Sequence, residues 1–284
     1  MRPLTEGWIA VNRLRRRIGK PPQAQWRQSW RTWIGEQVPG KSFADIGGLF
    51  GAAGEVAFVA EDAGASAVTL FDGGDVEYTA FPAEHERRAS KIRFVQGDLH
   101  DPLTVERVGL HDIVWCTGVL YHTPNPLDQL MQLRAITREQ LYLGCLTIPE
   151  LPGVENGCVF YPYLDEDSRR AHSRAHYRPE GGLGIGVPID ERPMLGYGNF
   201  WWGITPSALR SMLRSARFEV VEERHPHDHP WLTEIVARPV ERHPMMPPVD
   251  YYRRRREARE RGEPLLPHED YYERQADERR SVER

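Results

Sequence analysis

Short apolar segments alternate with helical patterns through the middle of the chain. Five of these segments predict buried strands, at residues 42–47, 67–72, 91–97, 111–119 and 140–148. Helical patterns are predicted between them at residues 52–64, 82–89 and 126–137. Strands that alternate with helices in this way predict an α/β fold with a mostly parallel sheet.

Further elements are predicted on both sides of this core. Residues 25–38 place Trp26, Trp30 and Trp33 at helical spacing, which predicts a helix that packs on the sheet or over the mouth of a ligand site. Thr205 begins another helix, because Thr caps well and proline is favoured at the first helical position. Two last apolar segments predict a closing pair of strands, at residues 218–223 and 232–240.

Glycines follow the first predicted strand, and acids end the next two. Gly47 and Gly51 permit a tight turn and a close approach to a ligand, which a Cβ would prevent. Asp72 could accept hydrogen bonds from both ribose hydroxyls, and Asp98 from an exocyclic base amine. Taken singly, these residues are equally well explained as turn glycines and solvated acids. Their order favours a nucleoside-containing cofactor, and a dinucleotide fits less well because Gly-x-Gly-x-x-Gly is absent.

These residues resemble the class I S-adenosylmethionine-dependent methyltransferases. The stretch Asp45-Ile-Gly-Gly-Leu-Phe-Gly51 is similar to their first motif. Leu49 stands where the family usually tolerates a left-handed backbone, so either the leucine is strained or the loop has another shape. The runs Gly118-Val-Leu-Tyr-His122 and Pro126-Leu-Asp128 are similar to the tRNA wobble-uridine carboxymethyltransferases and their small-molecule relatives. The resemblance covers roughly residues 40–240.

The resemblance implies a Rossmann-like, seven-stranded, mostly parallel sheet with helices on both faces. An insertion would lie between strand five and the last helix, and a C-terminal extension would follow the domain. The expected divisions are a helical segment at 1–40, a cofactor-binding methyltransferase domain at 41–240 with a substrate lid at 149–204, and a charged extension at 241–284. Paired tyrosines in that extension suggest docking onto the body or onto a second subunit.

The resemblance also implies S-adenosylmethionine as the cofactor. Leu99 is expected to pack on the adenine, and Thr117 and Gly118 are expected to contact the amino-acid half. The expected cofactor contacts are Asp45, Gly47, Gly48, Gly51, Asp72, Asp98, Leu99, Thr117 and Gly118.

The expected reaction is methyl transfer to a small molecule, with oxygen the first choice of acceptor atom. His122 is the candidate general base, since an imidazole with a pKa of about 6.5 is largely neutral at pH 7. A histidine here could instead orient the loop. Tyr121 is the second catalytic candidate, for positioning the substrate. The expected substrate-binding residues, which could instead anchor the insertion, are Tyr197, Asn199, Trp201 and Trp202.

Composition limits the alternatives. The net charge of −4 gives no global attraction to nucleic acid. The basic run 13–17 could contact a phosphate backbone but is more often a solvated helix face. Because the chain has no long apolar run, no signal core and no paired cysteines, we expect a cytoplasmic protein without a membrane span. The run His225-Pro-His-Asp-His229 is too short to surround one ion, so no metal is expected.

Two rival functions stay open at this point. One is a tRNA wobble-uridine modifier that uses a carboxylated form of the cofactor, which makes nucleic acid a partner that is possible but not favoured. The other is a methyltransferase-like scaffold without catalysis, which would follow if Leu49 disrupts the cofactor loop.

Overall fold

The fold is a seven-stranded sheet with helices on both faces. A computed structural model describes residues 24–49, 52–165, 167–168, 200–225, 232–240 and 260–262. The sheet has the order β3-β2-β1-β4-β5-β9-β8. Its strands are β1 (Ser42–Ile46), β2 (Ala67–Asp72), β3 (Arg93–Gln96), β4 (His111–Thr117), β5 (Thr137–Leu146), β8 (Phe218–Arg224) and β9 (Leu232–Pro239).

The strands from β1 to β5 pair in parallel, and β9 runs antiparallel between β5 and β8. The predicted fold class, with its closing antiparallel pair, is confirmed.

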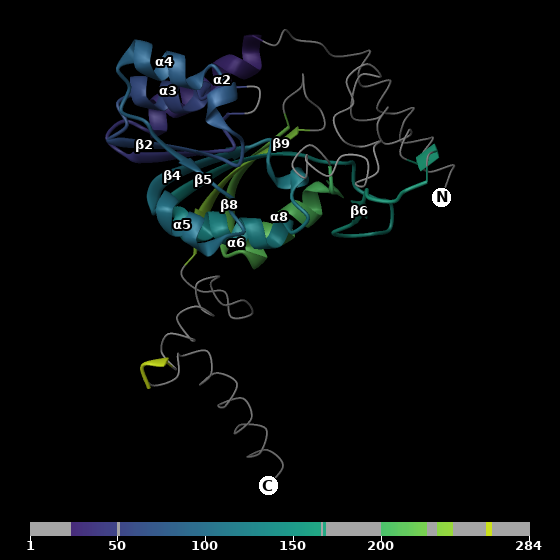
Figure 1. The fold of residues 1–284 in the computed structure, drawn as a ribbon. Coiled ribbons are helices and arrows are strands. Elements are labelled where there is room, and N and C mark those ends of the chain that lie inside the picture. Colours follow the sequence, from purple (N-terminus) through teal and green to yellow (C-terminus); the bar gives the residue numbers. More distant parts are fainter. Residues whose placement is uncertain are drawn as a thin grey trace.

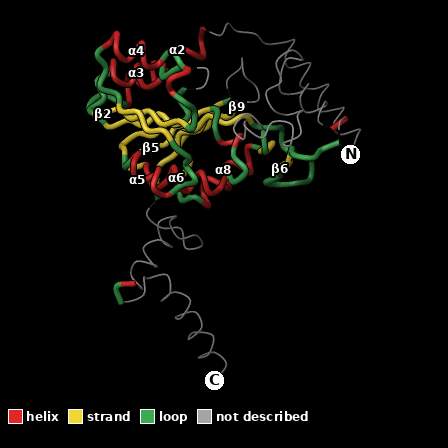
Figure 2. The backbone as a smooth tube through the Cα atoms, viewed as in Figure 1, coloured by secondary structure: helices red, strands yellow, loops and turns green. Residues whose placement is uncertain are grey.

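The helices divide into two layers (Figures 1 and 2). One layer contains α2 (Ala24–Gln37), α3 (Glu55–Asp62) and α4 (Phe81–Arg88). The other contains α5 (Pro102–Val108), α6 (Pro126–Ile136) and α8 (Pro206–Ser215). Two short 3-10 helices, η1 (Val76–Tyr78) and η2 (Leu120–His122), follow β2 and β4. None of the helices in the described ranges is long and apolar enough to cross a bilayer.

An aromatic cluster joins α2 to the sheet. The rings of Trp115 on β4 and Tyr142 on β5 stack at 3.9 Å between centroids. Trp33 meets Tyr142 edge-on at 4.8 Å, and Trp30 lies 6.1 Å from Trp115. Of the two roles predicted for the tryptophans of this helix, packing on the sheet is therefore the one observed for these two.

The opposite face of the sheet has its own core. Ile46 and Val114 point to the side of α6 and α8, whereas Phe43 and Ile113 point to the side of α2 and α3. This alternation buries both faces of the parallel strands, as a doubly wound sheet requires.

The structure differs from the predicted elements in places where local patterns are weak. Helix α3 begins at Glu55 rather than at residue 52, because Ala53 and Gly54 adopt positive φ angles of 46° and 79°. Helix α5 was not predicted, although Asp101 caps it by accepting from the Leu103 amide at 3.0 Å.

Strands β6 (Cys158–Phe160) and β7 (Trp202–Ile204), which form a separate two-stranded sheet, were also not predicted. Their partners lie more than 40 residues apart in the chain, so no local pattern reveals the pairing.

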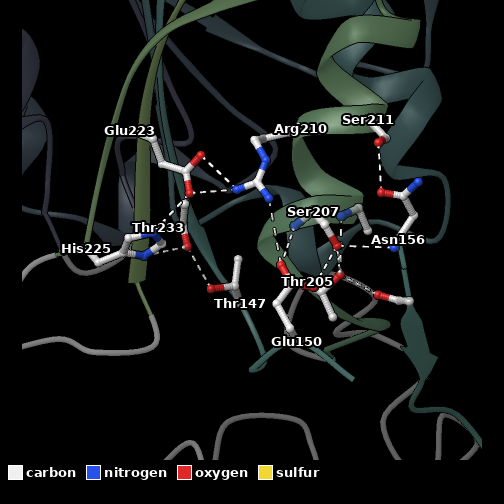
Figure 3. Close-up of polar contacts among 12 residues, drawn as sticks. Thr147, Glu150, Asn156, Thr205, Ser207, Arg210, Ser211, Glu223, His225 and Thr233 are labelled. Atoms are coloured by element: carbon white, nitrogen blue, oxygen red, sulfur yellow. Dashed lines mark hydrogen bonds and ion pairs between the residues drawn. The ribbon is translucent and has the colours of Figure 1, made fainter. Parts of the chain in front are cut away.

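Polar contacts fix the segment after β5 to the start of α8 (Figure 3). The Glu150 carboxylate accepts from the backbone amide of Ser207 at 2.8 Å and from its hydroxyl at 2.6 Å. The Arg210 guanidinium pairs with Glu223 of β8 at 3.0 Å. The Asn156 Oδ1 accepts from the Ser211 hydroxyl at 2.9 Å. The first described part of the insertion is thus held by the helix that follows it.

Trp115→Ala should lower the free energy of unfolding by about 3–5 kcal/mol, because it leaves a cavity among buried rings. Tyr78→Ala is the matched control: Tyr78 is 88% exposed, and its loss should change stability by less than about 0.5 kcal/mol. Urea denaturation measures both. Equal effects of the two substitutions would contradict the role of the aromatic cluster.

Candidate cofactor site

The predicted site residues lie near the ends of β1 to β4, around the point where the order of the strands reverses. Strand β1 pairs with β2 on one side and with β4 on the other. The loops that follow these strands therefore leave the same edge of the sheet on opposite sides of β1. Open α/β sheets bind their ligands at such a switch point, outside the carboxyl ends of the strands.

The backbone after β1 admits only glycine at two positions. Gly47 has a φ of 80°, and a Cβ there would lie 2.3 Å from Val119 Cγ2. A Cβ on Gly48 would lie 2.2 Å from Asp45 Oδ2. Both approaches are far below contact distance, so the loop after β1 depends on these two glycines. Gly51 lies outside the described residues.

Leu49 does not strain this loop. It is absent from the residues with positive φ, and its side chain is buried in the core beneath α3. Its amide donates to Asp72 Oδ2 at 2.9 Å. Of the two alternatives, the loop has a different shape, and Leu49 connects the end of β1 to the end of β2.

Asp45 is buried beneath the loop. Burial and the nearby Asp72 carboxylate raise the pKa of Asp45 to about 7, against a lowering contribution from the Ala57 backbone. Its Oδ2 has no hydrogen-bond partner among the described residues. An unpartnered buried carboxyl oxygen is costly, and such perturbed groups concentrate at functional sites.

Asp72 keeps acceptor capacity at the end of β2. Its Oδ1 accepts from the Gly74 amide at 2.7 Å, and its Oδ2 accepts from Leu49. A carboxylate offers about four lone-pair positions. Two backbone donors therefore orient the group and leave acceptor positions for two further hydroxyls.

Asp98 and Leu99 follow β3. Asp98 is exposed, and its Oδ1 accepts from the His100 amide at 2.9 Å. Leu99 is 4% exposed and belongs to the core on the side of α6.

Thr117 and Gly118 end β4 on the other side of the switch point. Thr117 Oγ1 accepts from the indole N–H of Trp115 at 3.2 Å. Gly118 has a φ of 77° and is exposed, and its amide donates to the Gly144 carbonyl at 2.9 Å.

The candidate catalytic residues lie on η2 in an aromatic setting. The His122 ring stacks on Phe200 at 4.8 Å with an interplanar angle of 25°. Tyr121 is buried, its ring lies 4.7 Å from Phe200, and its carbonyl accepts from the Trp201 amide at 2.9 Å. The end of the insertion is thereby brought against the loop after β4.

The structure describes two of the four predicted substrate-binding residues, Trp201 and Trp202, near the loop after β4. Trp202 donates from Nε1 to the Pro124 carbonyl at 3.0 Å, and its ring lies 4.8 Å from that of Phe160. The ring of Trp201 lies 6.2 Å from Phe160. Tyr197 and Asn199 lie outside the described residues.

One group in this region was not predicted from the sequence. His100 Nδ1 lies 2.6 Å from Asp128 Oδ2, and its Nε2 lies 2.7 Å from Thr123 Oγ1. His100 directly follows the predicted Asp98-Leu99 pair, and Asp128 belongs to the Pro-Leu-Asp run. Because the two residues are 28 positions apart, their pairing has no local signature.

The residues fit a nucleoside ligand that carries positive charge. Acids stand at the ends of β1 and β2 and after β3. Glu55, in the first turn of α3, is instead paired with Arg31. Carboxylates attract cations and repel a pyrophosphate. In the described part of the chain, no group of three or more His, Cys, Asp or Glu residues is arranged to hold a metal. Of the run at 225–229, only His225 is described.

No protein-family model and no curated protein matches the chain. Among solved structures, the N-terminal domain of EvdMO1 with SAH bound is 18% identical, with 75% of this chain and 80% of that one covered and a TM-score of 0.48. Magnesium protoporphyrin IX methyltransferase from Synechocystis PCC 6803 with bound SAH is 15% identical, with coverages of 78% and 90% and a TM-score of 0.48.

The [4+2]-cyclase SpnF is 12% identical, with coverages of 78% and 83% and a TM-score of 0.48. All three TM-scores lie below 0.5, so the function proposed below rests on the topology and residues of this chain.

Asp45→Asn should change how stability depends on pH. The pKa of Asp45 is about 7 in the folded chain and 3.8 without burial. The stability that its protonation supplies is therefore present below about pH 4 and is lost as the pH rises to about 7. Over this interval, wild type should lose roughly 2–4 kcal/mol relative to the variant. Chemical denaturation at several pH values measures this difference, and a constant difference would contradict the shifted pKa.

Proposed function

We propose that this protein is an S-adenosylmethionine-dependent methyltransferase that acts on a small molecule. One observation carries the proposal: the β1–β4 switch point gathers a glycine-dependent loop and three acids on adjacent strand ends. This arrangement suits a ligand with a ribose, a base amine and positive charge. The sulfonium cofactor has all three, and when bound it supplies an activated methyl group.

Different residues of the chain contact different parts of the cofactor. Asp72 accepts from the ribose hydroxyls with the lone pairs that its two backbone donors leave unused. Asp98 accepts from the adenine amine. Thr117 and Gly118 contact the amino-acid half, and Gly118 is exposed. The positive charge of the cofactor would favour the ionised form of Asp45 beneath the loop, whose pKa is raised to about 7 without it.

The chemical task of the protein is alignment. Methyl transfer is an in-line displacement, so holding the acceptor atom behind the methyl carbon provides much of the rate. His122 removes the proton of an acceptor hydroxyl, and Tyr121 positions the acceptor. O-methylation is therefore the reaction proposed first.

The aromatic side chains indicate the kind of acceptor. Phe160 is 44% exposed and lies beside Trp201 and Trp202. Exposed aromatic faces near a site favour a planar, partly apolar molecule. The candidate contact for a tRNA substrate, the basic run at 13–17, lies outside the described residues. The scaffold alternative depended on Leu49 disrupting the cofactor loop. Leu49 is unstrained and its amide donates to Asp72, so this argument for a scaffold no longer applies.

Calorimetric titration tests the cofactor. The protein should bind S-adenosylmethionine and S-adenosylhomocysteine in preference to the carboxylated analogue and to NAD. Asp72→Ala should weaken this binding by about 1–3 kcal/mol through lost hydrogen bonds to the ribose. Asp75→Ala is the matched control, because that exposed acid caps η1 three residues further on. Preference for NAD would refute the proposal, and preference for the carboxylated form would favour the tRNA modifier.

Two substitutions separate the roles of His122. His122→Phe retains a ring to stack on Phe200 and removes both ring nitrogens, including the basic one. If His122 is the base, turnover of an acceptor found by screening should fall about 10²-fold or more in both His122→Phe and His122→Ala, with cofactor affinity nearly unchanged. If the ring only orients the loop, His122→Phe should retain activity that His122→Ala loses.

A further inference from the structure

A single imidazole joins two of the loops at the carboxyl edge of the sheet. His100 lies on the loop after β3, two residues beyond Asp98. Its ring bonds Asp128 in the first turn of α6 and Thr123 directly after η2. The loop after β3 and the segment after β4 are thus connected by two side-chain hydrogen bonds, at 2.6 and 2.7 Å.

The donors and acceptors around this ring assign its proton. The Asn125 amide donates to Thr123 Oγ1 at 3.2 Å, and the same hydroxyl lies 2.7 Å from Nε2 of His100. The Asp128 carboxylate can only accept, which requires a hydrogen on Nδ1. The contact with Asp128 therefore places a hydrogen on Nδ1, whereas Nε2 can either accept from or donate to the Thr123 hydroxyl.

The connection reaches both halves of the candidate site. The backbone amide of His100 donates to the Asp98 carboxylate, the group proposed to accept from the adenine amine. On the other side, Thr123 is 2% exposed and follows His122. The His100 side chain thus joins the segment that carries Asp98 to the segment that carries His122, through bonds to Asp128 and Thr123.

We propose that His100 is a positioning residue, which sets the spacing between the adenine-binding loop after β3 and the catalytic loop after β4. This inference rests on the proposed function. The chain holds the cofactor base and the acceptor on different loops, so their alignment requires a fixed spacing. His100 provides it through bonds that are partly sheltered from water, with its side chain 25% exposed.

His85 supplies the matched control. Like His100, it is a partly buried histidine. Its Nε2 lies 3.0 Å from the Ile92 carbonyl, which is a bond to one chain segment where His100 bonds two. Ile92 precedes β3, so this contact lies at the opposite edge of the sheet from Asp98. His85→Ala thus removes a comparable side-chain bond without touching either loop.

The experiment compares the affinity for S-adenosylhomocysteine, the thermal midpoint and the split between kcat and KM. His100→Ala should weaken S-adenosylhomocysteine binding about tenfold, whereas His85→Ala should leave it within about twofold at a similar loss of thermal stability. Asp128→Ala should weaken binding as well. The double variant His100→Ala with Asp128→Ala should bind about as weakly as the poorer single variant, because both substitutions break one connection. The nitrogen NMR spectrum of the wild type should show Nδ1 protonated, as the contact with the Asp128 carboxylate requires.

The outcomes separate this inference from the function on which it rests. If the wild type binds S-adenosylhomocysteine and His100→Ala binds it equally well, the positioning role is overturned and the methyltransferase proposal stands. Equal losses of affinity in His100→Ala and His85→Ala, or fully additive effects of His100→Ala and Asp128→Ala, also overturn it. A wild type that binds no adenosyl ligand overturns both. A proton on Nε2 rather than Nδ1 overturns the assigned hydrogen bonds.

Discussion

A parallel sheet must be covered on both of its faces, and the rest of this structure follows from that constraint. Five parallel strands leave apolar side chains on two sides, such as Phe43 on one and Ile46 on the other. Helices must therefore cross in both directions from the centre of the sheet, with α2, α3 and α4 on one side and α5, α6 and α8 on the other (Figure 1). The crossing point between β1 and β4 leaves the loop ends exposed at one edge, where a ligand can bind.

The proposed chemistry at this edge depends on glycines and on an acid. The glycines have no side chain, and backbone amides hold the acid in place. Gly47 and Gly48 bring the loop onto Val119 and Asp45, closer than any Cβ permits. Asp72 is held by the amides of Leu49 and Gly74. Placing Asp45 and Asp72 near each other raises the pKa of Asp45 after the larger effect of burial. A cationic ligand would favour both carboxylates in their ionised form, which links the electrostatics of the fold to the proposed cofactor.

The region proposed to hold the acceptor is built from distant parts of the chain. Phe200 stacks on His122, the Trp201 amide bonds the Tyr121 carbonyl, and the Trp202 indole bonds Pro124. Glu150 and Asn156 hold the start of the insertion to α8, and Arg210 of α8 pairs with Glu223 of β8 (Figure 3). His100 connects the remaining pair of loops. Each contact joins segments that only the folded sheet brings together, so the geometry of the site depends on the stability of the whole domain.

The sequence by itself determined the sheet and indicated the strand ends at which the cofactor is proposed to bind. Buried strands have continuous apolar segments, Thr205-Pro206 is a local cap signal, and glycines and acids at strand ends are visible because they are adjacent in the chain. Tertiary structure decided what depends on contacts between remote residues. Those are the unstrained path of Leu49, the pairing of β6 with β7, the burial of Asp45 beneath the loop, and the bonds from His100 to Asp128 and Thr123. Hydrophobic periodicity is a property of neighbours along the chain, whereas a hydrogen bond across 20 or more residues depends on how the elements pack.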